Sequence, residues 1–140
     1  MHFFYLCDIH VLACGAEALK KYPRESYILQ TKGAPKVVVA EFVANLEKSF
    51  KELQLGEGGY LDLFSFHGVN RPEHLEWIFS AGGCWEVVEE YRKQGKIRFV
   101  GFSSHGHSDV ITQAIEVSPP PHHHPPPPVP SSPFTHFSTF

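Results

Sequence analysis

A chain of 140 residues, with 12 Lys and Arg against 15 Asp and Glu, has the size of one ordinary domain and a formal net charge of −3. It offers no basic stripe to nucleic acid, no acidic block, and no apolar run long enough to span a bilayer. We therefore expect neither a nucleic-acid partner nor a membrane protein.

The three cysteines, Cys7, Cys14 and Cys84, form no C-x-x-C pair and are odd in number. This usage predicts free thiols in a reducing compartment, and we expect no metal site. Residues 11–15 faintly resemble a lipoprotein cleavage site. However, the first Lys is Lys20, so the positive start of a secretion signal is missing. The sequence therefore indicates a cytoplasmic protein.

Strand and helix candidates alternate along the chain. Strands are predicted where aromatic and aliphatic residues run between turn residues, and helices where apolar residues recur every three or four positions. In chain order they are a short strand within 1–14, a helix end over 15–22, a strand over 26–31, a helix over 42–54, a strand over 60–67, helices over 72–79 and 84–94, a strand over 96–104 and a helix over 108–117 capped by Ser108. This rhythm is typical of a parallel α/β fold.

Residues 60–67 form the clearest strand candidate, because glycines and turn residues bound a run that is apolar on both faces. Such a strand is expected to be covered on each side. No G-x-G-x-x-G follows any strand candidate, which argues against a Rossmann dinucleotide domain.

Polar side chains stand at the ends of three successive strand candidates. They are Lys32, His67 and the pair Ser103 and Ser104. The carboxyl ends of the strands carry the chemistry in (β/α) barrels. We therefore expect Lys32, His67 and Ser103 to lie at the same end of three adjacent parallel strands.

Three segments, residues 28–32, 60–67 and 95–103, together resemble the aldo-keto reductases. Their order and spacing also match, since Lys32 and His67 are 35 positions apart and Ser103 follows 36 later. The resemblance covers about residues 15–117. It implies a partial (β/α)8 TIM barrel, of which this chain holds about three β/α units, the third to the fifth.

The resemblance also implies a chemistry. The family reduces carbonyls or oxidises alcohols by hydride transfer with NADP(H), using an Asp, a Tyr, a Lys and a His. The Tyr donates a proton, and the Lys favours ionisation of that phenol. By resemblance, Lys32 and His67 are catalytic, and Ser103 and Ser104 hold the nicotinamide carboxamide. Ser104 stands where relatives often carry Asn. The expected partner is a small carbonyl or alcohol substrate.

Tyr5 is the candidate proton donor, because it lies 27 residues before Lys32. It departs from the family pattern: Leu6 follows it in place of Gly, and its Asp partner would precede Met1. A (β/α)8 barrel commonly needs about 250 residues. We therefore expect a truncated and impaired enzyme whose open strand edges allow self-association. The first alternative is a non-enzymatic fragment.

Residues 118–140 differ sharply in composition, with nine prolines and no Lys, Arg, Asp or Glu among 23 residues. Such a tail is expected to be disordered or polyproline II, which divides the chain into domains 1–117 and 118–140. The run of His122, His123 and His124 reads as low complexity rather than a metal site. Residues 125–130 could dock on a proline-reading domain, so the second alternative is a proline-rich interaction module.

Overall fold

Four parallel strands form one sheet in the order β1-β2-β3-β4, which is also their order in the sequence. The computed structural model describes residues 2–5 and 15–119, and of residues 2–5 the backbone alone. β1 spans His2–Tyr5, β2 Tyr27–Gly33, β3 Leu61–Phe66 and β4 Ile97–Phe102. The parallel α/β prediction is confirmed, including the short strand expected within residues 1–14.

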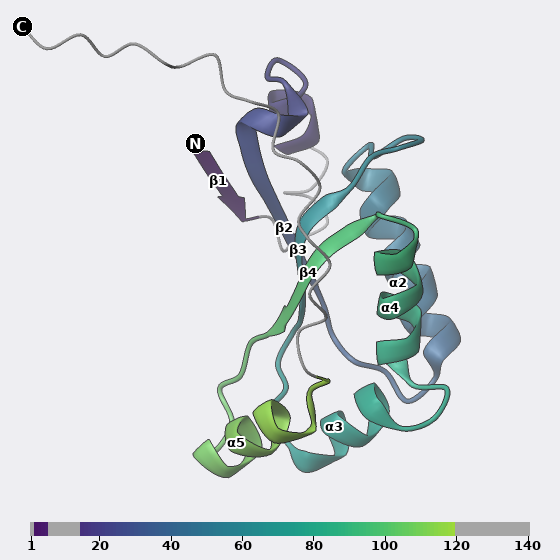
Figure 1. Ribbon diagram of the computed structural model, residues 1–140, viewed down its shortest axis with the longest axis vertical. Helices are drawn as coiled ribbons and strands as arrows, with labels where there is room; N and C mark the ends of the chain where they lie inside the picture. The colour runs from purple at the N-terminus through teal and green to yellow at the C-terminus, as the bar shows by residue number, and fades with distance from the viewer. Residues whose placement is uncertain (1, 6–14, 120–140) are drawn as a thin grey trace, which may run out of the picture.

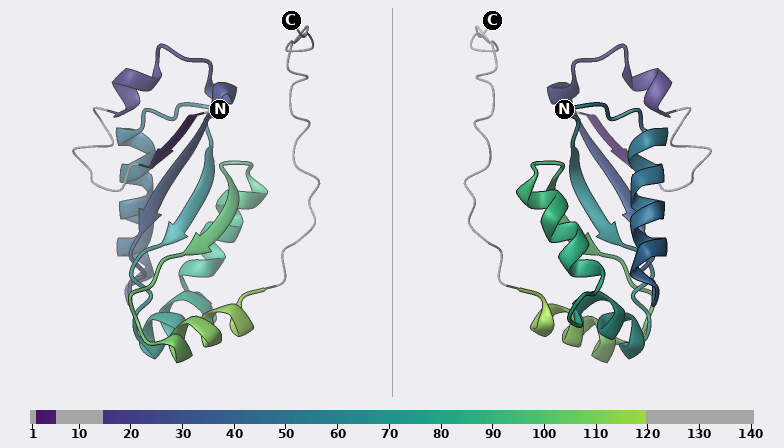
Figure 2. Two further views of the ribbon diagram at one scale, coloured as in Figure 1. Left: turned by 90° about the vertical axis from the view of Figure 1, so that its left-hand side faces the viewer. Right: turned by 90° about the vertical axis from the view of Figure 1, so that its right-hand side faces the viewer.

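Two helices, α2 (Val39–Glu52) and α4 (Cys84–Lys93), cover one face of the sheet (Figure 1). Two more, α3 (Pro72–Phe79) and α5 (Ser108–Val117), lie near the carboxyl ends of the strands. Residues 15–19 are helical, and η1 (Arg24–Ser26) precedes β2. No described helix covers the other face (Figure 2). β3 is nonetheless buried on both faces, as predicted: Leu61 and Ser65 are 0% and 7% exposed on one face, and Phe64 and Phe66 are 1% and 2% exposed on the other.

An aromatic cluster joins α2 to the sheet. Phe42 stacks on Phe66, with ring centroids 5.7 Å apart, and meets Phe64 edge-on at 6.0 Å. Phe42 and Phe64 are each 1% exposed. Phe64 and Phe66 are two positions apart in β3, so their side chains lie on the same face of the strand and meet the apolar stripe of α2. This cluster identifies the helix-covered face as the one carrying Phe64 and Phe66.

The opposite face of the sheet carries two rows of register partners. Gln30, Leu63 and Phe99 form one row, and Lys32, Ser65 and Gly101 form the next. The amide of Gln30 donates to Ser65 Oγ at 2.9 Å, which confirms that these side chains share a face. Phe99 is 58% exposed, an unusual position for a large aromatic side chain.

Helix boundaries agree with the sequence to within a few residues. The capping role expected of Ser108 is wrong, because Ser108 is the first residue of α5 and His107 occupies the N-cap without a side-chain cap bond. His107 Nδ1 instead lies 3.2 Å from Asp109 Oδ2 in the first turn. Residues 120–140 lie outside the described residues, so the tail and the domain boundary at residue 118 stay predictions.

Gly83 is the N-cap residue of α4 and lies in close contact with the end of α3. A Cβ there would lie 2.7 Å from the carbonyl oxygen of Ile78 and 2.8 Å from that of Ser80. We expect Gly83→Ala to lower the free energy of unfolding by about 1–3 kcal/mol, because backbone atoms must move. Gly56→Ala is the control, since nothing lies within 4 Å of its added Cβ. Urea unfolding measures both, and equal effects would contradict the packing described here.

Candidate active site

The carboxyl ends of β2, β3 and β4 bring three sequence-predicted residues to one edge. The His67 N–H donates to the carbonyl of Gly33 at 2.9 Å, and the Ser103 N–H donates to the carbonyl of Phe66 at 2.9 Å. Lys32 lies in β2 beside Ser65 of β3. The predicted placement at one end of three adjacent parallel strands is confirmed, whereas the chemical roles of these residues stay predictions.

A side-chain contact at this edge joins His67 and Ser103. His67 Nδ1 lies 3.1 Å from Ser103 Oγ, and the Gly68 N–H donates to the same oxygen at 3.4 Å. His67 is exposed, so a small molecule can reach its ring. The contact couples a group that can donate or accept a proton to a hydroxyl on the neighbouring strand.

Lys32 lies farther from His67 than Ser103 does. Because His67 follows Ser65 by two residues on the adjacent strand, the Cα atoms of Lys32 and His67 are about 8 Å apart by strand geometry. Lys32 is half-buried.

Ser104 bonds within the loops, a structural role that the sequence left open beside the cofactor role. Its hydroxyl donates to the Val69 carbonyl at 2.6 Å and accepts from the Gly106 N–H at 2.9 Å. The only proton of this hydroxyl is thus used to join the loop after β3 to the loop after β4. A cofactor role for Ser104 stays a prediction, and it would require this bond to break.

Asn70 and Gly106 complete the junction between the same two loops. Asn70 Oδ1 accepts from the His105 N–H at 2.7 Å, and a Cβ on Gly106 would lie 2.5 Å from the Asn70 carbonyl oxygen. Only a residue without a side chain fits so close to another backbone. The turn residues after each strand predicted the two loops, but no spacing of residues in the sequence predicted that the two loops touch.

His74 fixes the turn that follows His67. Its Nδ1 lies 2.9 Å from the Gly68 carbonyl oxygen, and Arg71 Nε lies 3.4 Å from its Nε2. The Asn70 N–H also lies 3.2 Å from Nδ1, which donates to the Gly68 carbonyl when protonated and accepts from Asn70 when not. The His74 ring also packs on Trp77, with centroids 4.9 Å apart. His74 therefore supports the backbone that carries His67.

Tyr5 ends β1, where it pairs in register with Gln30. Its backbone is therefore two residues short of the level of Lys32 on the neighbouring strand. The side chain of Tyr5 lies outside what the structure describes. Its proposed role as proton donor stays a prediction.

A charged cluster lies at the opposite, amino-terminal end of the sheet. Asp62 accepts from Arg24 Nη2 at 2.6 Å, from the Leu29 N–H at 2.9 Å and from Arg98 Nη1 at 3.0 Å. The Tyr60 ring lies between the two guanidinium groups, whose Cζ atoms are 3.9 and 4.1 Å from its centroid. All of these charges are partnered, so the cluster is structural.

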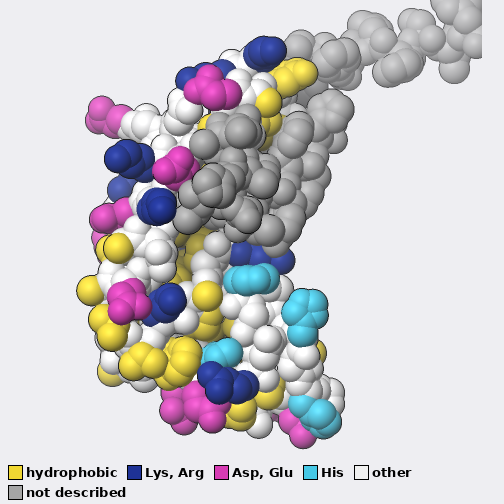
Figure 3. All heavy atoms as spheres, turned by 180° about the vertical axis from the view of Figure 1, so that it is seen from behind, with side chains coloured by type: hydrophobic (Ala, Val, Ile, Leu, Met, Phe, Trp, Pro, Cys, Tyr) yellow, Lys and Arg dark blue, Asp and Glu magenta, His cyan; other side chains and the backbone are white. Residues whose placement is uncertain are grey.

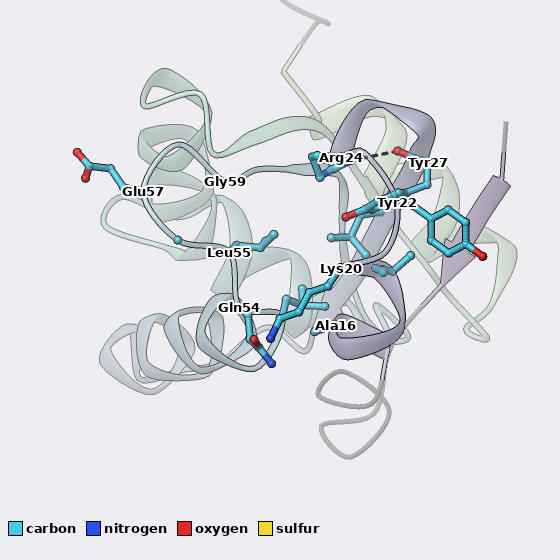
Figure 4. Close-up of a pocket in the computed structure, with 13 residues that line it drawn as sticks. Ala16, Lys20, Tyr22, Arg24, Tyr27, Gln54, Leu55, Glu57 and Gly59 are labelled. Atoms are coloured by element: carbon cyan, nitrogen blue, oxygen red, sulfur yellow. Dashed lines mark hydrogen bonds between the residues drawn. The ribbon is translucent and has the colours of Figure 1, made fainter.

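A hollow of about 240 Å³ lies near this cluster, between residues 16–29 and 53–59 (Figure 4). Arg24 lines it but is already bonded to Asp62 and to the carbonyl groups of Tyr27 and Tyr60. Lys20 pairs with Glu17 at 2.7 Å. The hollow therefore offers no unpartnered charge from these two residues, and it is at the wrong end of the sheet for the candidate site.

Other kinds of site find little support among the described residues. Histidines gather on the face shown in Figure 3, but no three described His, Cys, Asp or Glu side chains are grouped to hold a metal ion. Cys84 is fully buried, and this burial raises the pKa of its thiol, which disfavours the nucleophilic thiolate. None of the described helices is long and apolar enough to cross a membrane.

A family model described as "Aldo/keto reductase family" matches residues 8–129. No curated protein matches the chain significantly. Among solved structures, the holo form of an aldo-keto reductase from Bacillus halodurans is 24% identical with a TM-score of 0.64, and the match covers 83% of this chain and 40% of that one.

Two further structures have the same fold. A thermostable aldo-keto reductase solved with the inhibitor epalrestat is 25% identical with a TM-score of 0.61, covering 80% of this chain and 38% of that one. A Bombyx mori aldo-keto reductase solved with NADP is 24% identical with a TM-score of 0.58, covering 83% and 40%. The chain thus spans about two fifths of the length of these barrels and matches part of one.

Proposed function

This chain belongs to the aldo/keto reductase family, and we propose that Lys32, His67 and Ser103 belong to the catalytic mouth of an NADP(H)-dependent oxidoreductase that interconverts carbonyls and alcohols. The observation that carries this proposal is the 3.1 Å contact between His67 Nδ1 and Ser103 Oγ at the carboxyl ends of adjacent parallel strands. Catalytic residues of (β/α)8 barrels come from this end of the sheet. The substrate would be a small aldehyde, ketone or alcohol.

His67 would act directly on the substrate oxygen. An exposed imidazole next to a hydroxyl can orient a carbonyl by hydrogen bonding and stabilise the charge that develops on its oxygen. Lys32 would favour the ionised form of a nearby phenol, the role proposed here toward Tyr5. Together, these residues would bind and orient the substrate and transfer the proton.

Ser103 fits the amide end of a nicotinamide. When His67 is protonated on both ring nitrogens, Nε2 can donate to the substrate oxygen, while Ser103 Oγ accepts from Nδ1 and from the Gly68 N–H. Its own hydroxyl proton is then left to donate to a carboxamide oxygen. NADP(H), when bound, would supply the hydride. The complex of the Bombyx mori protein with NADP supports this choice of cofactor. Ser104 fits less well, because its proton is already bonded to Val69.

A binding titration tests this function. We expect NADPH to bind the full 140-residue chain, and Ser103→Ala to weaken binding about tenfold, as the loss of one hydrogen bond of about 1.4 kcal/mol would do. Ser26→Ala is the matched control, because its hydroxyl bonds the Pro23 carbonyl at the other end of β2. Nicotinamide fluorescence reports binding. Equal affinities for Ser103→Ala and the wild type would overturn the assignment.

The cellular location belongs to the same proposal. The odd number of cysteines favours a reducing compartment, and the cytoplasm is the location we propose.

A further inference from the structure

The peptide group between Gly68 and Val69 is held at both of its ends. Its carbonyl oxygen, on Gly68, lies 2.9 Å from His74 Nδ1, and its N–H, on Val69, donates to the Ser103 carbonyl at 2.9 Å. His74 lies in the first turn of α3. This one peptide group therefore connects α3 to the residue that carries the candidate nicotinamide-binding hydroxyl.

The loop that carries this peptide group has few restraints of other kinds. It joins β3 to α3, and its residues His67, Asn70 and Arg71 are exposed. Gly68 has a φ of +70° and no side chain to pack, so its backbone rotates more freely than that of other residues. Val69 is the one buried residue of this loop, at 1% exposure. The orientation of the peptide group therefore depends on its polar contacts.

His74 can hold the peptide group firmly because it lies on a packed helix. Leu75 and Ile78 anchor α3 in the core, where they are 7% and 1% exposed. The His74 ring also packs on Trp77, with centroids 4.9 Å apart. A side chain on a rigid element is positioned more precisely than one on a loop. His74 therefore fixes the loop relative to α3.

The neighbours of His74 favour a proton on Nδ1. Arg71 Nε and Nη2 both lie 3.4 Å from His74 Nε2, and a guanidinium group can donate but not accept. Nε2 accepts from Arg71 when it carries no proton, which leaves the proton of the neutral ring on Nδ1. Nδ1 then donates to the Gly68 carbonyl. The contact from the Asn70 N–H to Nδ1 is longer, at 3.2 Å, and belongs to the other tautomer.

We propose that His74 is a positioning residue for the nicotinamide end of NADP(H), acting on Ser103 through the Gly68–Val69 peptide group. This inference rests on the proposed function. While His74 holds the Gly68 carbonyl, the Val69 N–H stays bonded to the Ser103 carbonyl. The Ser103 hydroxyl then stays 3.1 Å from His67 Nδ1, in the place proposed for the carboxamide. Without the His74 bond, the peptide group can rotate at Gly68 and its contact with Ser103 loosens.

Two substitutions of His74 separate its hydrogen bond from its ring packing. His74→Phe keeps an aromatic ring beside Trp77 but has no N–H for the Gly68 carbonyl, whereas His74→Asn loses the ring and places an amide N–H where Nδ1 was. A packing role alone predicts that His74→Phe behaves as the wild type, and the positioning role predicts that His74→Asn does. His107→Phe is the control, because His107 is 78% exposed and contacts Asp109.

Amide hydrogen exchange in the full chain without cofactor, followed by nuclear magnetic resonance, measures the contact itself. The Val69 N–H should exchange about tenfold faster in His74→Phe, because the peptide group loses a restraint, and within about twofold of the wild-type rate in His74→Asn and His107→Phe. A Val69 rate that His74→Phe leaves unchanged, or that His74→Asn raises equally, would overturn the proposal. If His74→Phe does not fold, His74→Leu removes the same N–H and decides the matter.

NADPH titration of the full chain measures the effect on the cofactor. His74→Phe should weaken binding about fivefold, less than Ser103→Ala does, because the hydroxyl is displaced and not removed. Combined with Ser103→Ala, His74→Phe should cause no further loss, and an equal loss in both backgrounds would overturn action through Ser103. A wild type that does not bind NADPH would overturn the proposed function and the cofactor role, whereas the Val69 exchange rates would still decide whether His74 holds the peptide group.

Discussion

Replacing Asp62 with Asn should lower the free energy of unfolding by about 3 kcal/mol. Asp62 is 8% exposed and accepts hydrogen bonds from Arg24, Arg98 and the Leu29 N–H. Removing its charge leaves two guanidinium groups facing each other across Tyr60 with no anion between them. We choose the lower end of the range for buried pairs because the Arg98 side chain is 33% exposed.

Asp109→Asn is the matched control for this prediction. Asp109→Asn also removes a carboxylate that contacts a basic side chain, His107 at 3.2 Å, but both side chains are 78% exposed. Its effect should stay within about 0.5 kcal/mol. Urea unfolding at neutral pH measures both variants. If Asp62→Asn lowers the free energy of unfolding as little as Asp109→Asn does, the charged cluster does not stabilise the amino-terminal end of the sheet.

The elements of the fold could be predicted from the sequence because their signals are local. The run of residues 60–67 between glycines predicted β3, and the apolar stripe of residues 42–54 predicted α2. The meeting of Lys32, His67 and Ser103 at one edge followed from parallel strands alone. The distance between the His67 and Ser103 side chains also depends on the backbone hydrogen bond from the Ser103 N–H to the Phe66 carbonyl, which aligns the two strand ends.

What could not be predicted depends on contacts between distant segments. Arg24 and Arg98 reach Asp62 from 38 and 36 positions away, and no spacing rule links them. The bond from Ser104 to Val69 exists because two loops meet at Gly106.

The 140-residue chain should consume NADPH with aldehydes about two to four orders of magnitude more slowly than a full-length aldo-keto reductase, because no general acid is placed beside His67 in the described residues. Four of the five tyrosines lie elsewhere. Tyr22 is exposed before β2, Tyr27 begins β2, Tyr60 lies between Arg24 and Arg98, and Tyr91 packs on Phe50 at 5.5 Å. Tyr5 is the fifth, and its position is known for the backbone alone.

We therefore expect His67→Ala to alter the slow turnover less than twofold, since orienting a carbonyl accelerates little where proton transfer is missing. NADPH consumption over an aldehyde panel, with the Bacillus halodurans protein assayed alongside, measures the rates. Fast turnover that both His67→Ala and Tyr5→Phe abolish, while Tyr22→Phe leaves it intact, would instead establish Tyr5 as the donor of a complete catalytic mouth.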